Sequence, residues 1–353
     1  MKNNEKVLLS GLSVLEDYIK QGKIPGGQIA FVTKDEAGFN HAGYAQTVDE
    51  EVMVEENTLY DIASLTKVVS TTTMALTLIE KGYFSLKTPL KQLLPEFRFD
   101  NVLIQHVLSH TSGICFDDKA YKSLHGRKQI LDFVCAKELE FEPGTKVVYS
   151  DFGFVLLGFA IENIVGRLDE YAKKVIFDPL KMNNTIYRPE DHNMKQRCAA
   201  TEITSDRGLV RGEVHDGKAY RLDGLSGNAG LFSNSQDLSR FVRMLLNQGQ
   251  LEENRILSKA TINLFKKCYT EGLNSRRTLG WICNDSNTHM GDYYSDKCIF
   301  HTGFTGTSIY VDFVRECGII LLTNRVHPNR DNNSIMELRD KVHNVMLCEF
   351  DNR

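Results

Sequence analysis

A serine and a lysine three positions apart, Ser64 and Lys67, follow a short strand-like run and begin an apolar segment rich in small residues. A serine hydroxyl is a poor nucleophile at neutral pH and needs a base within hydrogen-bond distance. Residues three apart share one face of a helix, so the Lys67 amine can point at the Ser64 oxygen. The unpaired N–H groups at a helix start can also stabilise an oxyanion. The pair therefore predicts a nucleophile with its own base.

Two other segments, far from Ser64 in the chain, carry residues suited to the same chemistry. Residues 149–151 read Tyr-Ser-Asp in a run rich in turn formers, and residues 301–303 read His-Thr-Gly between two strand-like runs. A Ser-x-x-Lys sequence alone also occurs at the solvated start of many ordinary helices. The three segments in this order are far rarer, and we therefore interpret them as parts of one site.

The order and spacing of these segments resemble the serine β-lactamase and penicillin-binding protein superfamily, whose motifs are Ser-x-x-Lys, Tyr-x-Asn and Lys-Thr-Gly. Supporting phrases at residues 108–114, 227–233 and 301–307 are similar to the branch of class C β-lactamases and related esterases and D-amino-acid peptidases. The resemblance extends over roughly residues 25 to 328, which is most of the chain.

The resemblance implies a role for each matching residue. Ser64 would be acylated, and Lys67 and Tyr149 would share the proton traffic, with the choice of base between them left open. The backbone N–H groups of Ser64 and Phe304 would form the oxyanion hole, because the second donor follows the Lys-Thr-Gly triad in this family. Burial disfavours the charged form of a lysine, so we expect the pKa of Lys67 to be lowered and Lys67 to be partly neutral near pH 7.

The resemblance also implies that the substrate contacts Asp151, His301, Thr302 and Gly303. Two of these four residues differ from the residues usual in the family motifs. Asp151 stands where asparagine is usual, and an ionised aspartate only accepts hydrogen bonds. His301 stands where lysine is usual, so it should be mostly neutral at pH 7 and gain charge as the pH falls toward 6. The missing permanent cation weakens the case for an efficient β-lactamase. Gly303 is expected to leave room for a substrate beside the strand.

Three further polar residues have open or structural interpretations. His110 is interpreted as a histidine that satisfies backbone groups where a helix meets a loop. His215 and Asp216 lie in an irregular stretch, and the sequence leaves open whether they hold the loop or contact the substrate.

The motifs lead to one main functional interpretation and two alternatives. The main one is a serine hydrolase that works through an acyl-enzyme on a small ester, amide or, less efficiently, a β-lactam. One alternative is a true β-lactamase or a D-Ala-D-Ala carboxypeptidase. The other is a catalytically silent protein that keeps the fold to bind peptides or partners, which the intact set of Ser64, Lys67 and Tyr149 argues against. No metal or cofactor is expected.

Composition narrows the class of protein further. The chain has 353 residues, 42% of them hydrophobic and 25% charged, as in ordinary globular proteins. A net charge of −4 gives no reason to expect a nucleic-acid partner. The eight cysteines include no Cys-x-x-Cys pair, so they predict no zinc site. Without a secretory signal pattern or an apolar run long enough for a membrane span, a cytoplasmic protein of undetermined oligomeric state is expected.

The elements that must position these residues form a clear pattern along the chain. A helix is predicted at the N-terminus, then two strands at about residues 28–33 and 39–43, a helix from Ser64 to about Gly82, and a helical middle. No firm element is expected between residues 191 and 230. Strands are predicted at 280–282, 297–300, 307–312 and 318–323, before a helix over 334–347.

Strand patterns at both ends of the chain, with helices between them, predict a discontinuous α/β domain and an inserted helical domain. The first would comprise residues 1–86 and 270–353, and the second residues 87–269. The family resemblance implies an α+β fold in which an antiparallel sheet is flanked by helices, with the active site in the cleft between the two domains.

Overall fold

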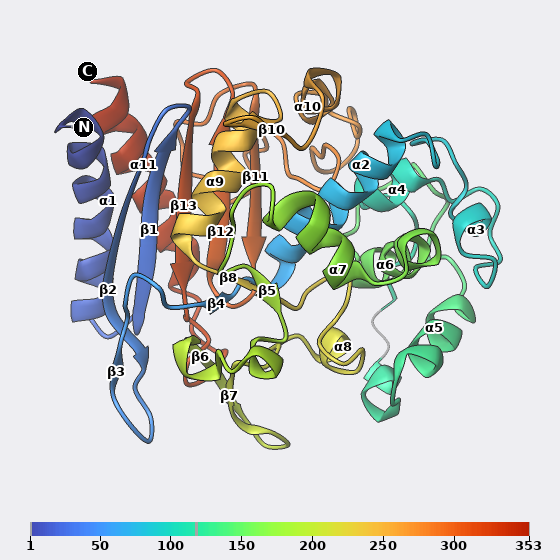
Figure 1. Ribbon diagram of the computed structural model, residues 1–353, viewed down its shortest axis with the longest axis horizontal. Helices are drawn as coiled ribbons and strands as arrows, with labels where there is room; N and C mark the ends of the chain where they lie inside the picture. The colour runs from blue at the N-terminus through green and yellow to red at the C-terminus, as the bar shows by residue number, and fades with distance from the viewer. Residues whose placement is uncertain (1, 117–118, 353) are drawn as a thin grey trace.

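The computed structural model describes residues 2–116 and 119–352, and its centre is a six-stranded antiparallel sheet of order β11-β12-β13-β1-β2-β3 (Figure 1). These strands are β1 (Gly26–Thr33), β2 (Ala37–Gln46), β3 (Val52–Met53), β11 (Cys298–Gly303), β12 (Thr307–Asp312) and β13 (Cys317–Thr323). Because β1 pairs with β13, the two ends of the chain meet in one sheet. The predicted α+β fold class with an antiparallel sheet is confirmed.

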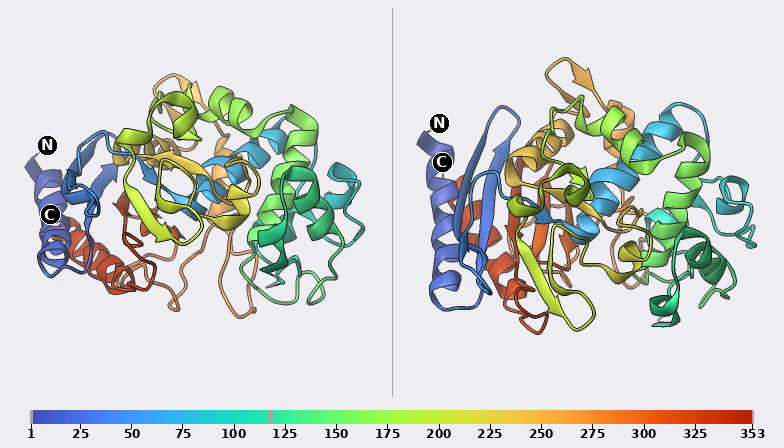
Figure 2. Two further views of the ribbon diagram at one scale, coloured as in Figure 1. Left: turned by 90° about the horizontal axis from the view of Figure 1, so that it is seen from below. Right: turned by 60° about the horizontal axis from the view of Figure 1, so that its bottom comes forward.

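Helices cover both faces of the sheet and build the rest of the molecule. The main ones are α1 (Lys2–Lys20), α2 (Thr73–Glu80), α3 (Leu90–Leu93), α4 (Ile104–Leu108), α5 (Arg127–Cys135), α6 (Asp151–Val165), α7 (Leu168–Ala172), α9 (Ser235–Leu246), α10 (Lys259–Phe265) and α11 (Ile335–Asp351). Helices α1 and α11 lie side by side at one end of the molecule, and α9 covers the opposite face of the sheet (Figures 1 and 2).

Strand β1 shows why the sheet is covered on both sides. Ile29 and Phe31 belong to the apolar cluster under α1 and α11, whereas Ala30 and Val32 belong to the larger cluster on the opposite face. Side chains alternate across a strand, so a strand that is apolar at consecutive positions must be buried on both faces.

Helix α6 lies at the centre of the helical part, in contact with α3, α4, α5 and α7. Its sequence is apolar around nearly the whole helix, which is typical of a buried helix. The Ser150 side chain caps the helix by accepting a hydrogen bond of 2.9 Å from the Gly153 N–H. The cap fixes where α6 begins and therefore holds Tyr149 and Asp151 on either side of it.

The segment between residues 191 and 230, for which the sequence predicts no firm element, does contain regular elements. It contains a hairpin of β6 (Ala200–Thr204) and β7 (Gly208–Arg211) and a short helix, α8 (Gly217–Tyr220). The hairpin sequence has no clear apolar alternation. It is held in part by the buried Arg211 side chain, whose Nε donates to the Cys198 carbonyl at 2.8 Å.

The prediction of a strand at residues 280–282 is wrong. Ile282 forms only isolated bridges, with Arg277 and Phe300. Gly280 has a φ of +79°, which interrupts an extended backbone, and a Cβ there would lie 2.4 Å from the Thr72 hydroxyl.

A small sheet of order β4-β8-β5 includes the strand that precedes Ser64. Its strands are β4 (Tyr60–Asp61), β5 (Ile186–Tyr187) and β8 (Leu231–Ser233). The domain division predicted above stays a prediction, and α9, which falls in its helical part, packs on the main sheet. Among the described residues, no helix combines the length and apolar character needed to cross a membrane.

Candidate active site

Ser64 lies in a tight turn that directly follows β4. A 3₁₀ turn at Ala63–Leu65 leads into a widened π-helical turn at Lys67–Thr72, and the regular helix α2 begins only after it. Ala63 has a φ of +46°, and its N–H donates to the Asp61 carboxylate at 2.8 Å. The sequence predicts a regular helix from Ser64, but its first turns are 3₁₀ and π, a geometry that is frequent at functional sites.

The residues before Ser64 are tied to the turn between β11 and β12. Thr305 Oγ1 donates to the Asp61 carbonyl at 2.7 Å, and Thr307 Oγ1 donates to the Ile62 carbonyl at 3.1 Å. These buried bonds fix Ser64 relative to the edge strand of the sheet, although the two segments are about 240 residues apart in the chain.

Gly303 is required by this same packing. A Cβ at Gly303 would lie 2.1 Å from Thr307 Oγ1 and 2.5 Å from the Ile62 carbonyl oxygen. The expectation that glycine leaves room for a substrate is therefore corrected, because the close neighbours are the protein's own atoms. The turn holds Phe304, the next residue, with 49% of its surface exposed.

The Lys67 side chain is fully buried and its ammonium meets three oxygen acceptors. Nζ lies 3.0 Å from Ser64 Oγ, 2.8 Å from Asp151 Oδ1 and 2.9 Å from the Asn228 carbonyl oxygen. An ammonium has three N–H donors and no acceptor, so this environment satisfies the charged form completely.

The protonation state of Lys67 differs from the expectation drawn from burial. Burial does lower the pKa of Lys67, but the Asp151 carboxylate and Tyr149 together outweigh it, and the net pKa lies above the ordinary value for lysine. The expectation of a partly neutral lysine near pH 7 is therefore wrong for the protein without a bound substrate.

Tyr149 contacts the same serine from another side. Its hydroxyl donates to Ser64 Oγ at 2.7 Å, and its ring stacks on His110 with centroids 4.6 Å apart. His110 Nδ1 accepts the Ser150 N–H at 3.0 Å, which agrees with the structural role predicted for His110. Desolvation raises the pKa of Tyr149, and the nearby Lys67 ammonium only partly offsets that rise.

The Asp151 carboxylate bridges two lysines. Oδ1 binds Lys67, and Oδ2 accepts from Lys218 Nζ at 3.1 Å, the second lysine lying on α8. Burial alone would raise the pKa of Asp151, but the two ammonium groups hold it well below its usual range. The sequence predicts a substrate contact here, whereas both oxygens have protein partners.

His301 is buried in β11, with 2% of its surface exposed. Its Nδ1 bonds to the Thr302 carbonyl at 2.9 Å, and its ring lies beside Tyr149 and Trp281, with centroids 6.3 and 6.4 Å away. Burial, together with the charges of Lys67 and Arg277, holds the pKa of His301 well below its ordinary value. The expectation that His301 gains charge near pH 6 is therefore corrected.

Comparison with known proteins identifies the family to which this arrangement belongs. The family model described as Beta-lactamase matches residues 13–343, nearly the whole chain. The chain belongs to this beta-lactamase family. Its members are serine hydrolases, which agrees with the serine, lysine and tyrosine found in contact.

Two curated relatives of this beta-lactamase family member have peptidoglycan-related names. An N-acetylmuramyl-L-alanine amidase from Bacillus subtilis (strain 168) is 30% identical over 85% of this chain and 77% of its own length. A putative D-alanyl-D-alanine carboxypeptidase from Escherichia coli (strain K12) is 31% identical, over 81% and 74%. The solved structure of EstCE1, a hydrolase with promiscuous acyltransferase activity, has the same fold, with a TM-score of 0.78 and 21% identity over 97% of this chain and all of its own.

The structure gives roles to residues at this beta-lactamase-like site whose roles the sequence missed or left open. Lys218 lies in the segment without predicted elements, and its Nζ donates to Asp151, whereas Asn228 supplies its backbone carbonyl to Lys67. His215 stacks on the Phe304 ring with centroids 5.6 Å apart. Asp216 caps α8 by accepting from the backbone N–H groups of its first turn, so its observed contacts support the loop.

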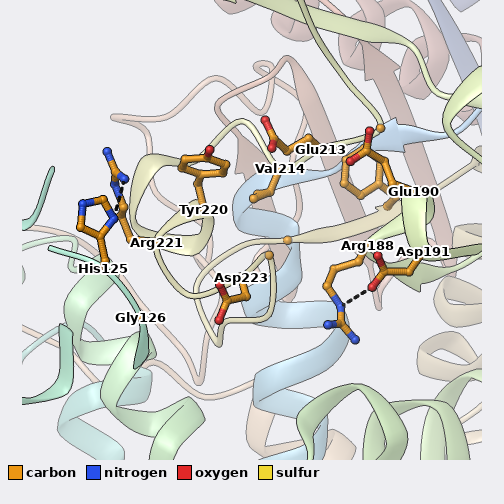
Figure 3. A pocket seen from close by; sticks show the side chains of 14 residues that line it. His125, Gly126, Arg188, Glu190, Asp191, Glu213, Val214, Tyr220, Arg221 and Asp223 are labelled. Atoms are coloured by element: carbon orange, nitrogen blue, oxygen red, sulfur yellow. Dashed lines mark hydrogen bonds and ion pairs between the residues drawn. The ribbon is translucent and has the colours of Figure 1, made fainter. Parts of the chain in front are cut away.

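A separate cavity of about 340 Å³ lies beside the segment that carries His215 (Figure 3). Its walls include Arg188, Tyr220, Arg221 and Asp223, but none of the serine, lysine and tyrosine of the candidate site. Among the described residues there is no group of three or more histidine, cysteine, aspartate or glutamate side chains placed to hold a metal ion.

Replacing Asp151 with asparagine should shift the pH profile of the enzyme. Asp151 stabilises the Lys67 ammonium, so asparagine should lower the pKa of Lys67 and move the acid limb of kcat/KM to lower pH, by about one to three pH units. Measuring kcat/KM for p-nitrophenyl butyrate from pH 5 to 10 tests this.

The matched control is Asp132→Asn, which removes an exposed aspartate–lysine pair on α5 and should leave the profile unchanged. An acid limb in Asp151→Asn that coincides with wild type would mean that Asp151 does not set the pKa of the group that produces this limb.

Proposed function

We propose that this chain is a hydrolase in which Ser64 forms an acyl-enzyme in a cleft between the sheet and the helical part of the molecule. The observation that carries the proposal is the convergence of two groups on Ser64 Oγ: Lys67 Nζ at 3.0 Å and the Tyr149 hydroxyl at 2.7 Å. A nucleophile beside a base, with the base held by a third group, is the arrangement used in covalent catalysis. Asp151 is that third group.

In acylation, Ser64 Oγ attacks the substrate carbonyl carbon and its proton passes to the Lys67–Tyr149 pair. Both Lys67 and Tyr149 are protonated at rest, because the pKa of each lies above its ordinary value. The reactive form is therefore the one in which the pair has lost one proton. Because the two groups are in contact, this proton is lost from the pair as a unit. The collapse of the tetrahedral intermediate breaks the bond to the leaving amine or alcohol, which takes the proton. Water then attacks the acyl-enzyme and gives a proton to the pair. When the second intermediate collapses, the bond between the acyl carbon and Ser64 Oγ breaks, the pair returns that proton to Ser64 Oγ, and the acid is released.

The oxyanion of each intermediate would bind the backbone N–H groups of Ser64 and Phe304. The support for this is the buried pair of threonine bonds that join the β11–β12 turn to the residues before Ser64. Donors already fixed in place stabilise developing charge without reorganising. Thr302 and Phe304 keep exposed surface for substrate, whereas His301 and Gly303 are buried and would shape the strand.

The substrate class proposed is a small ester or amide, including alanyl amides from cell-wall fragments. The two curated relatives are an amidase and a putative carboxypeptidase by name, both concerned with alanine linkages. A class C-like branch of the family is the assignment we favour from the motifs. All eight cysteines are free thiols, which supports the proposed location in a reducing cytoplasm.

A true β-lactamase is the weaker candidate because His301 is neutral and buried. Penicillins and cephalosporins carry a carboxylate, and a fixed lysine cation at this position would bind it. The expected order of kcat/KM at pH 7.5 is therefore p-nitrophenyl butyrate, which has no carboxylate, above the cephalosporin nitrocefin. Failure to hydrolyse either substrate, together with no covalent labelling by a fluorophosphonate, would favour the catalytically silent alternative.

Replacing His301 with lysine should raise kcat/KM for nitrocefin by about tenfold to a hundredfold, as expected for one charge-assisted hydrogen bond. Ester turnover should change little, because p-nitrophenyl butyrate has no carboxylate.

In wild type, the KM for nitrocefin should stay flat between pH 9 and 6, since His301 stays neutral over this range. Equal changes for both substrates in the variant would contradict a role of this position in carboxylate recognition.

A further inference from the structure

Arg339 is a buried cation without an acidic partner. It lies on α11 with 3% of its surface exposed, and among the described residues no carboxylate forms an ion pair with it. Its Nε is also buried without a hydrogen-bond partner. Burying a charge without an ion-pair partner is energetically costly. Burial lowers the pKa of Arg339 to about 9, so it is charged at neutral pH.

The contacts of Arg339 show where this charge acts. Its Nη2 donates to the Gly303 carbonyl at 3.2 Å and to the Thr307 carbonyl at 2.9 Å, the two ends of the β11–β12 turn. The Gly303 carbonyl and the Phe304 N–H belong to the same peptide unit. A cationic donor on the carbonyl oxygen withdraws electron density from the amide and makes its N–H a stronger donor.

We infer that Arg339 is a positioning residue that polarises the Gly303–Phe304 peptide and so strengthens the Phe304 N–H as an oxyanion donor. The inference rests on the proposed function, because it requires the oxyanion to form at Ser64. The benefit is confined to states with negative charge on the substrate oxygen, so Arg339 acts on the transition state more than on substrate binding.

The same turn offers a matched comparison. Arg325 is also buried, and its Nε donates to the Phe304 carbonyl at 2.9 Å. That carbonyl belongs to the next peptide, between Phe304 and Thr305, which does not carry the Phe304 N–H. Removing Arg325 therefore loosens the same turn without removing the charge from the oxyanion peptide.

The test uses the full-length variants R339Q, R339K and R325Q with p-nitrophenyl butyrate as substrate. Phenylboronic acid is the second probe, because it forms a tetrahedral adduct with a serine and puts an oxygen in the oxyanion hole. We expect R339Q to lower kcat about three- to tenfold and to lower the affinity for phenylboronic acid by a similar factor. The KM for p-nitrophenyl butyrate should stay within about twofold of the wild-type value. Thermal unfolding of each variant measures the structural cost separately.

R325Q should lose as much thermal stability as R339Q but keep the wild-type affinity for phenylboronic acid. Equal weakening in both variants would overturn the inference, since the position of the turn would then be the cause. Wild-type kcat and affinity in R339Q would also overturn it. If R339Q does not fold, R339K decides: its single ammonium cannot reproduce the guanidinium contacts, so affinity should fall about two- to fivefold, and unchanged affinity overturns the proposal.

This experiment also separates the inference from the proposed function. Phenylboronic acid that binds S64A as tightly as wild type would refute Ser64 as the nucleophile. Binding that depends on Ser64 but is the same in wild type and R339Q would refute only the role of Arg339.

Discussion

Replacing Ser64 with alanine should abolish covalent labelling by a fluorophosphonate and lower turnover of p-nitrophenyl butyrate on the order of 10⁴- to 10⁶-fold, as for other serine nucleophiles. Without Oγ no acyl-enzyme can form, and the two groups that converge on that oxygen lose their common partner. Intact-mass measurement after incubation with the probe checks the adduct directly, and steady-state kinetics check the turnover.

The fold of Ser64→Ala should be intact, because the segment is held by the bonds of Thr305 and Thr307 to the backbone before Ser64. Ser85→Ala, which changes an exposed serine after α2, is the control and should be labelled like wild type. A stoichiometric adduct on Ser64→Ala would show that another residue is the nucleophile.

Lys67→Ala and Tyr149→Phe should each lower kcat by about 10²- to 10⁴-fold, the usual contribution of a positioned acid or base. KM should change far less, because both groups act on the proton of Ser64 and neither needs to hold the substrate. The double variant should be hardly worse than either single one, since residues that act as a unit are not additive. Pre-steady-state acylation rates for p-nitrophenyl butyrate measure this.

Lys128→Ala on the exposed face of α5 is the control for loss of a lysine and should leave kcat unchanged. Tyr149→Phe keeps the ring that stacks on His110, so its loss of rate would report the hydroxyl alone. Losses that multiply in the double variant would mean that Lys67 and Tyr149 act independently and that one of them is structural.

The sequence predicted the parts of the site that depend on residue type and local spacing. Ser64, Lys67 and Tyr149 are close together in the structure, as the three motifs and their order predict. The antiparallel sheet was also predictable, because strands such as β1 and β13 are short apolar runs bounded by turn residues. The hairpin of β6 and β7 was missed because its polar sequence is held by distant contacts such as that of Arg211.

Residue types and their spacing along the chain specify the chemical identity of the groups at the site and the order of the elements that carry them. The charge state of those groups, in contrast, depends on which neighbours the folded chain brings into contact. Lys67 keeps its proton because Asp151, 84 positions away, lies 2.8 Å from its ammonium, and His301 stays neutral because β11 is buried beside other cations. Charges interact through distance and local dielectric, neither of which the order of residues along a chain records.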